Sequence, residues 1–131
     1  MPTPQTFSDV TLVLSGTRQS SASLTVPASY QRVDMAIVST TPAWNTLDRD
    51  DRLTFGLEYF DGAAWRFLVG NDPAAGGRLG RAMAQDRRLS RGGGLPRLGG
   101  GPWPHIDGRS LRVFARTTAA NLTLVARVTI S

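Results

Sequence analysis

The sequence predicts an all-β fold, an antiparallel two-sheet β-sandwich with a jelly-roll-like arrangement. Apolar and polar residues alternate with a period of two along much of the chain, which is typical of strands that bury one face. The apolar runs are short, and Gly, Pro, Asp and Asn separate them, as expected for strands joined by turns. With 131 residues the chain has the size of one domain, which buries about two thirds of its unfolded surface. We therefore treat residues 1–131 as a single domain.

The first half of the chain contains three predicted strands, at residues 10–15, 21–26 and 32–40. In the first strand, Val10, Leu12 and Leu14 lie on one face. Pro27 ends the second strand, because proline cannot donate a hydrogen bond to the sheet. In the third strand, the side chains from Val33 to Ser39 alternate in the same way.

A β-hairpin is predicted next, with strands at residues 52–60 and 64–69. The dipeptide Asp61-Gly62 between them is a strong signal for a tight hairpin turn. In the first of these strands, alternation places four apolar side chains on one face: Leu53, Phe55, Leu57 and Tyr59.

The last two predicted strands, at residues 110–117 and 121–130, bring the number to seven. Alternation in the last strand is the most regular in the chain, so its apolar side chains should enter the core with two from the neighbouring strand. This predicted core comprises Leu122, Leu124, Val128, Ile130, Leu111 and Val113.

The net positive charge is concentrated in one Gly-rich stretch, residues 76–101. All 15 basic residues of the chain are Arg, and this stretch holds six of them with one acid, Asp86, and nine of the 14 Gly. The other residues carry nine Arg and nine acids. A GC-rich genome would explain the missing Lys but not the clustering. We therefore predict an inserted basic loop, in which residues 78–89 form either an eighth strand or two turns of helix that the flanking Gly disfavour.

This loop is where we expect function, since long loops in compact domains are usually functional or disordered. Arg makes planar, bidentate contacts with carboxylates and phosphates, and apolar side chains within the loop can anchor it. The predicted partner-binding residues are Arg78, Leu79, Arg81, Arg87, Arg88, Leu89, Arg91, Arg97 and Trp103.

Residues suited to catalysis or metal binding are few. His105 is the single His and Glu58 the single Glu; we expect the first to be a loop residue packing near Trp103 and the second to face out of its sheet. Asp48, Asp50 and Asp51 offer Ca²⁺ ligands, but neighbouring arginines favour a salt-bridged loop. We expect neither an enzyme nor a bound metal or cofactor.

The sequence also bears on location. It has no Cys, so a disulfide framework and a Cys-ligated zinc site are excluded. No run reaches the 18 or so apolar residues of a membrane span, and the N-terminal residues lack the features of a signal peptide. We expect a protein made in the cytoplasm with no membrane partner.

Two binding functions compete with a structural one. The Arg cluster suits nucleic acid, but it contains no aromatic residue until Trp103. A β-sandwich with loop tryptophans also suits a carbohydrate- or receptor-binding module, with Trp44, Trp65 and Trp103 as the available side chains. Packing against the core is the alternative for each of these tryptophans.

Five parts of the chain carry a resemblance: SLTVPASYQRVDMAIV, Trp44 after a Pro, LTFGLEYFDGAAW, the GG-containing middle, and SLRVFARTTAANLTLVARVTIS. Together they resemble small β-sandwich structural proteins of tailed phages, and they cover most of the chain. The resemblance implies a virion protein that decorates or cements the capsid, bound to the major capsid protein or another virion protein. It also implies symmetric self-association, for which we expect a trimer, and no active site to transfer.

Overall fold

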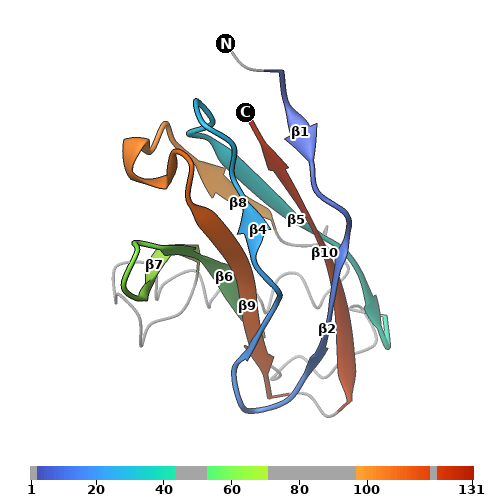
Figure 1. The fold of residues 1–131 in the computed structure, drawn as a ribbon. Helices are drawn as coiled ribbons and strands as arrows, with labels where there is room; N and C mark the ends of the chain where they lie inside the picture. Colours follow the sequence, from blue (N-terminus) through green and yellow to red (C-terminus); the bar gives the residue numbers. More distant parts are fainter. Residues whose placement is uncertain (1–2, 44–52, 71–96, 119–120) are drawn as a thin grey trace.

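The computed structural model of the chain describes residues 3–43, 53–70, 97–118 and 121–131. In these ranges ten strands form two antiparallel sheets that pack against each other (Figure 1). Sheet A contains β1 (Gln5–Thr6), β2 (Val10–Leu14), β5 (Val33–Thr41), β8 (Arg97–Gly100) and β10 (Leu122–Ile130). Sheet B contains β3 (Gln19–Ser20), β4 (Leu24–Thr25), β6 (Leu53–Phe60), β7 (Trp65–Gly70) and β9 (Ser110–Thr117).

The strand pairings are nested. β2 pairs with β10, β3 and β4 pair with β9, β5 pairs with β8, and β6 pairs with β7. The chain is thus one long antiparallel hairpin that closes between β6 and β7. The hairpin is rolled up so that β10 also pairs with β5 and β9 with β6. This strand order is that of a jelly roll, and the predicted fold class is confirmed.

The closing turn forms as its sequence predicts. Asp61 accepts hydrogen bonds from the backbone N–H groups of Ala63 and Ala64 at 2.8 Å through Oδ1. Gly62 has φ of +101°, in the left-handed region that glycine adopts without strain. Asp61 also receives a hydrogen bond from Arg66 Nε at 2.6 Å. The Arg66 hydrogen bond, with those from Ala64 and Ala63, holds the pKa of the Asp61 carboxyl well below its ordinary value.

Six predicted strands are present within one or two residues of their expected bounds, whereas the one at residues 21–26 is not. In its place are the two short strands β3 and β4, which lie on either side of Ser21. Ser21 donates its backbone N–H to the Val113 carbonyl at 2.8 Å, but its side-chain Oγ accepts the Val113 N–H at 2.9 Å. Because a side chain here replaces a backbone acceptor, the regular ladder is interrupted.

The end of the predicted basic loop is also different, since Arg97–Gly100 is the edge strand β8 and not loop. Leu98 pairs with Met35 and packs against the core, and Gly99 pairs with Asp34. A Cβ on Gly99 would lie 2.6 Å from the Val33 carbonyl oxygen, so glycine allows the close approach of the two backbones. The glycines that predicted a loop here instead belong to a strand that lies close to β5. Residues 78–89, predicted as strand or helix, lie outside the described residues.

The core lies between the sheets and contains the side chains that alternation assigned to it. Leu111, Val113, Leu122, Leu124, Val128 and Ile130 are all fully buried. They pack with inward side chains of the other long strands, including Met35, Ile37, Leu53, Phe55 and Leu57. The prediction of the core from the C-terminal strands is therefore confirmed.

Candidate functional site

Most of the predicted partner-binding residues lie outside the described residues. These are Arg78, Leu79, Arg81, Arg87, Arg88, Leu89 and Arg91. The structure does describe the strands on either side of them. β7 ends at Gly70 and β8 begins at Arg97, and each is an edge strand of its sheet. These two edge strands contact each other.

Arg97 lies on the outer face of sheet A, where its Nη2 is 2.6 Å from Asp34 Oδ2. The side chain of Arg97 is 67% exposed and that of Asp34 is 51% exposed. Exposed pairs of this kind contribute little to stability. Arg97 is therefore a surface side chain with one partner on the neighbouring strand.

Trp103 follows β8 and anchors this part of the chain to the domain. Its backbone N–H donates to the Gln31 carbonyl at 2.8 Å, and its half-buried ring packs against the core. The ring covers Gly100, where an added Cβ would lie 2.9 Å from Trp103 Cζ2. Trp103 thus packs against the core, which was one of the two roles expected for it beside partner binding. Arg97 and Trp103 thus do not share one surface.

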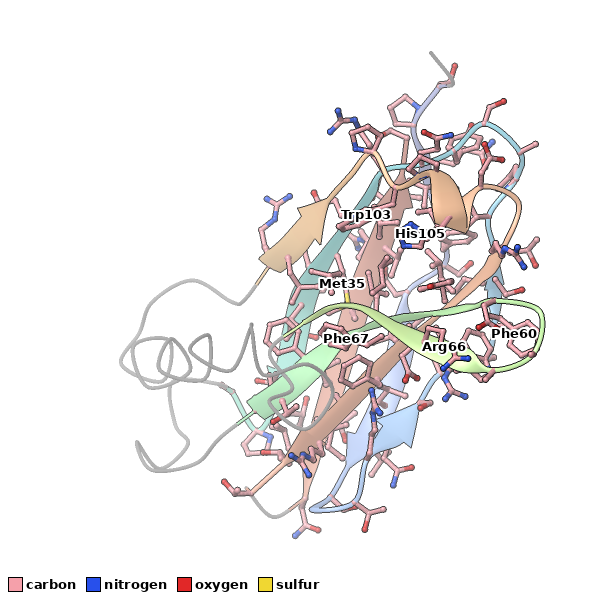
Figure 2. All side chains as sticks on the ribbon, turned by 90° about the vertical axis from the view of Figure 1, so that its left-hand side faces the viewer. Met35, Phe60, Arg66, Phe67, Trp103 and His105 are labelled. Carbon is pink, nitrogen blue, oxygen red and sulfur yellow. The ribbon has the colours of Figure 1, made fainter. Side chains whose placement is uncertain are left out.

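His105 lies two residues after Trp103, and Figure 2 shows the two side chains at the same end of the sandwich. It belongs to the 3-10 turn Pro104–Ile106, and its exposed ring meets the edge of the Tyr59 ring with centroids 4.8 Å apart. His105 is a loop residue, as expected, and its ring contact is with Tyr59 of sheet B.

Glu58 points away from the core, as predicted. Its side chain is nevertheless only 8% exposed, because it lies between two arginines. Glu58 Oε1 accepts a hydrogen bond from Arg112 Nε at 2.8 Å, and Oε2 lies 3.2 Å from Arg18 Nη2. A buried carboxylate needs such partners, because desolvation otherwise disfavours its charge.

Aromatic rings complete this cluster. The Arg18 guanidinium lies 3.7 Å from the centre of the Phe114 ring, and that of Arg112 lies 4.4 Å from the centre of Trp65. Phe67 leans toward Phe114, with ring centroids 6.2 Å apart. We call Arg18, Glu58, Trp65, Phe67, Arg112 and Phe114 the arginine–aromatic face.

The local sequence explains why the arginine–aromatic face forms. Arg112 and Phe114 alternate along β9 with inward Leu111, Val113 and Ala115, so both project outward. Phe114 pairs with Gly56 on β6, and an added Cβ on Gly56 would lie 2.6 Å from Phe114 Cζ. The missing side chain therefore makes room for the ring. The alternation of Arg112 and Phe114 with apolar residues is visible in the sequence, but by itself it indicates only the side that faces away from the core.

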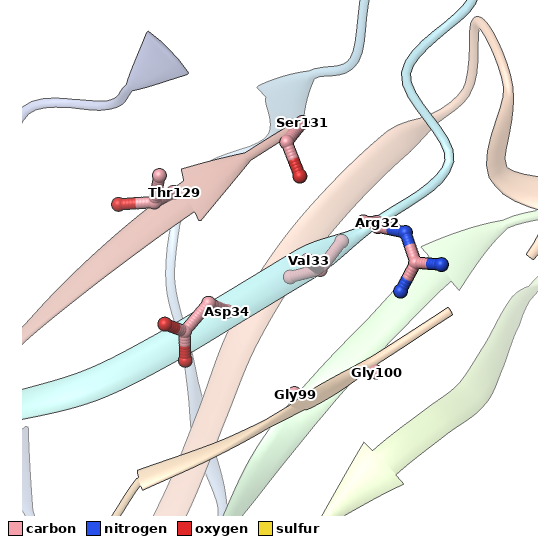
Figure 3. A pocket seen from close by; sticks show the side chains of 7 residues that line it. All are labelled: Arg32, Val33, Asp34, Gly99, Gly100, Thr129 and Ser131. Carbon is pink, nitrogen blue, oxygen red and sulfur yellow. The ribbon is translucent and has the colours of Figure 1, made fainter. Parts of the chain in front are cut away.

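Sheet A carries a depression of about 350 Å³ at the end of β5, β8 and β10 (Figure 3). Its lining comprises Arg32, Val33, Asp34, Gly99, Gly100, Thr129 and Ser131. Polar groups are present, but none of these side chains is aromatic, so the depression offers no ring on which a sugar could stack.

The described residues also bear on metal sites and membrane-spanning helices. Within residues 3–43, 53–70, 97–118 and 121–131, no three His, Asp or Glu side chains come together as a metal site. The acidic group Asp48, Asp50 and Asp51 lies outside these ranges, as does Trp44. None of the described segments forms a helix long and apolar enough to cross a membrane.

There are therefore two candidate sites. One is formed by β7 and β8, the strands that flank residues 71–96, and the other is the arginine–aromatic face. Comparison of the chain with protein-family models, with curated proteins and with solved structures found no match.

Proposed function

We propose that this chain is a non-enzymatic virion protein that decorates or cements a phage capsid, attaching mainly through residues 71–96. The proposal rests on the resemblance of the sequence to structural proteins of tailed phages and on the jelly-roll fold, which viral capsid domains use. The expected partner is the major capsid protein or another virion protein, on the capsid surface.

The observation that carries the proposal is that residues 71–96 are flanked by two edge strands that contact each other, β7 and β8. Five Arg and two Asp lie in this segment, and the residues directly before and after it, Gly70 and Arg97, belong to strands of the sandwich. A segment held at both ends loses less conformational freedom on binding than a free tail of the same length. Its arginines can then form bidentate contacts with carboxylates of a partner surface.

Replacement of residues 71–96 by a flexible Gly/Ser linker of about eight residues, which spans roughly 15 Å, tests this role. The replacement must keep β8, because Leu98 packs against the core. We expect a folded, soluble domain that has lost its binding to empty, DNA-free capsids. Unchanged capsid binding by this variant would refute the proposed attachment.

A matched variant separates charge from the presence of the segment. Arg78, Arg81, Arg87, Arg88 and Arg91 are changed to Gln with the chain length unchanged, and binding should again be lost. Trp103→Ala is less informative, because Trp103 packs against the core and its truncation also lowers stability.

Nucleic-acid binding is the alternative that the Arg content itself suggests. If residues 71–96 neutralise phosphates, affinity for free DNA should fall log-linearly and steeply with salt. Attachment to a protein lattice through desolvated Arg contacts should weaken only slightly over the same range. Tight DNA binding with no affinity for empty capsids would favour the nucleic-acid function.

A carbohydrate- or receptor-binding module is the remaining alternative, because lectins also use the jelly roll. One face of the Trp65 ring is covered by Arg112 and the Trp103 ring packs against the core, so both rings already have partners within the domain. Mass spectrometry of purified virions together with a glycan-binding screen distinguishes this function. Sedimentation of the purified chain tests the proposed trimer.

A further inference from the structure

The arginine–aromatic face holds two arginines in place against one carboxylate. Arg18 and Arg112 both contact Glu58, and Arg18 has a further interaction besides. The side chains of Arg18 and Arg112 are 35% and 27% exposed. The cluster is thus accessible at its rim, although Glu58 itself is nearly buried.

Arg112 presents the more specific geometry. Its hydrogen bond to Glu58 is made through Nε, and its guanidinium lies over the Trp65 ring. A guanidinium carries five N–H groups in a fixed plane, and the two terminal nitrogens present parallel N–H bonds that match a carboxylate. In the described part of the chain, the polar contact of Arg112 is with Glu58 through Nε, on a side edge of this plane.

The rotamer of Arg112 is fixed before any partner arrives. Glu58 accepts the hydrogen bond from Arg112 Nε, and the Trp65 ring packs against one face of the Arg112 guanidinium. A side chain that is already ordered pays a smaller entropic cost on binding. Arg and Trp are also the residue types that most often dominate binding energy in protein interfaces.

We propose that the arginine–aromatic face is a second docking surface, which binds an extended protein segment carrying an Asp or Glu beside an apolar residue. The carboxylate pairs with the terminal nitrogens of Arg112, and the apolar side chain packs against the exposed parts of Trp65 and Phe67. This surface lies outside residues 71–96 and does not depend on the function proposed for them.

The local charge favours a protein segment over nucleic acid. Arg18 and Arg112 both contact the Glu58 carboxylate, and Arg66 on β7 is paired with Asp61 at 2.6 Å. Phosphate-backbone binding instead depends on neutralising several phosphates with uncompensated cations. A single preorganised Arg beside aromatic rings suits one carboxylate.

Nuclear magnetic resonance of the ¹⁵N-labelled full chain tests the proposal. The probe is a blocked hexapeptide of alternating Leu and Glu, and the control peptide has Gln in place of Glu. We expect the Arg112 Nε–Hε and Trp65 indole signals to shift saturably with the Glu peptide, with about tenfold weaker binding of the Gln peptide.

Arg112→Lys keeps the charge but loses the planar pair of donors, so it should weaken binding of the Glu peptide about tenfold. The matched control is Arg66→Lys, on β7 of the same sheet, which should leave the affinity unchanged. Both variants are first checked for an unchanged fold by circular dichroism. The linker variant lacking residues 71–96 should bind the peptide as the full chain does, which separates this test from that of the proposed function.

Three outcomes would overturn the proposal. They are equal shifts with both peptides, no shift at millimolar peptide, and tighter binding of a thymidine oligonucleotide than of the Glu peptide at the same salt concentration. If Arg112→Lys fails to fold, the comparison of the Glu and Gln peptides on the unaltered chain still tests the proposal.

Discussion

The outer faces of the two sheets differ although the same alternation of residues built them. On sheet A, the outward side chains are small or form exposed ion pairs, and Val13 is 69% exposed. Asp9–Arg127 and Asp34–Arg97 lie in solvent. On sheet B, Phe114 also points away from the core, but it is fully buried. One outer face is a solvated surface, and the other contains a packed layer of its own.

This difference shows that strand alternation identifies which side faces the main core and says nothing about the opposite side. The outward side of sheet A has Thr, Val and Ser, whose side chains are too short to cover one another. The outward side of sheet B has Arg and aromatic residues, whose long or flat side chains stack and bury their neighbours. The size and stacking ability of the outward side chains therefore decide whether a second layer forms.

The comparison is tested most strongly by truncating one outward apolar side chain on each sheet. Phe114→Ala should destabilise the domain by about 3–5 kcal/mol, as for a buried core aromatic. Val13→Ala should have almost no effect, because Val13 is mostly exposed. Urea denaturation of both variants measures the difference. Similar small losses would mean that the layer on sheet B contributes no packing energy.

The inward faces provide a reference for that result. Leu124→Ala on β10 should cost about 2–5 kcal/mol, because the side chain is fully buried. Thr123→Ala, on the outer face of the same strand, should cost much less. The melting temperatures of the two variants report the difference. If the two variants melted at the same temperature, the assignment of the inner face would be wrong.

The ion pairs of the two faces should also differ. Glu58→Gln leaves Arg18 and Arg112 together without a counter-charge near the nearly buried position 58, and should cost about 2–4 kcal/mol. Asp34→Asn removes the exposed pair with Arg97 and should cost at most about 1 kcal/mol. Chemical denaturation at low and high salt checks both values. An equal loss in the two variants would contradict the distinction between the faces.

The smallest expected effect concerns the hairpin that borders the arginine–aromatic face. The pKa of Asp61 is lowered in the folded state by Arg66 and by the N–H groups of Ala64 and Ala63. Its stabilising contribution is therefore complete above the unfolded carboxyl pKa of about 4 and is lost as the pH falls toward the lower folded value. In Asp61→Asn the side-chain oxygen can still accept the hydrogen bonds of the turn, but the side chain no longer has an ionisable carboxyl group.

The melting temperatures of the unaltered chain and Asp61→Asn are compared between neutral pH and pH 2. The difference should be small and constant above about pH 5 and should shrink as the pH falls below about 4. A difference that grew on acidification would show that the sign assigned to this group is wrong.

Much of the fold could be predicted because its signals are local. Asp61-Gly62 specifies a turn through its own backbone and side chain, and the alternation of Leu122 to Ile130 requires one buried face whatever the partner strand. The bounds of β3, β4 and β8 were not predictable in this way. Ser21 interrupts its strand through Val113, 92 positions away, and Gly99 belongs to a strand because β5 offers an edge.

The candidate site was predicted in part. The sequence indicated residues 76–101 from charge and glycine content alone, and the structure adds that Arg97–Gly100 and Trp103 belong to the sandwich. The arginine–aromatic face was missed because Arg18, Glu58, Trp65 and Arg112 come from four different strands or loops. The pairing of β6 with β7 and β9, and of β3 with β9, brings their side chains together.

The sequence by itself determined that this protein is a β-sandwich, which side chains of its long strands enter the core, and where its positive charge concentrates. Those properties depend on neighbouring residues and on a period of two. The tertiary structure decided which strands are neighbours, which glycines allow close approach, and which outward side chains become buried. Those depend on contacts between distant residues, and the nested pairing of the jelly roll determines them.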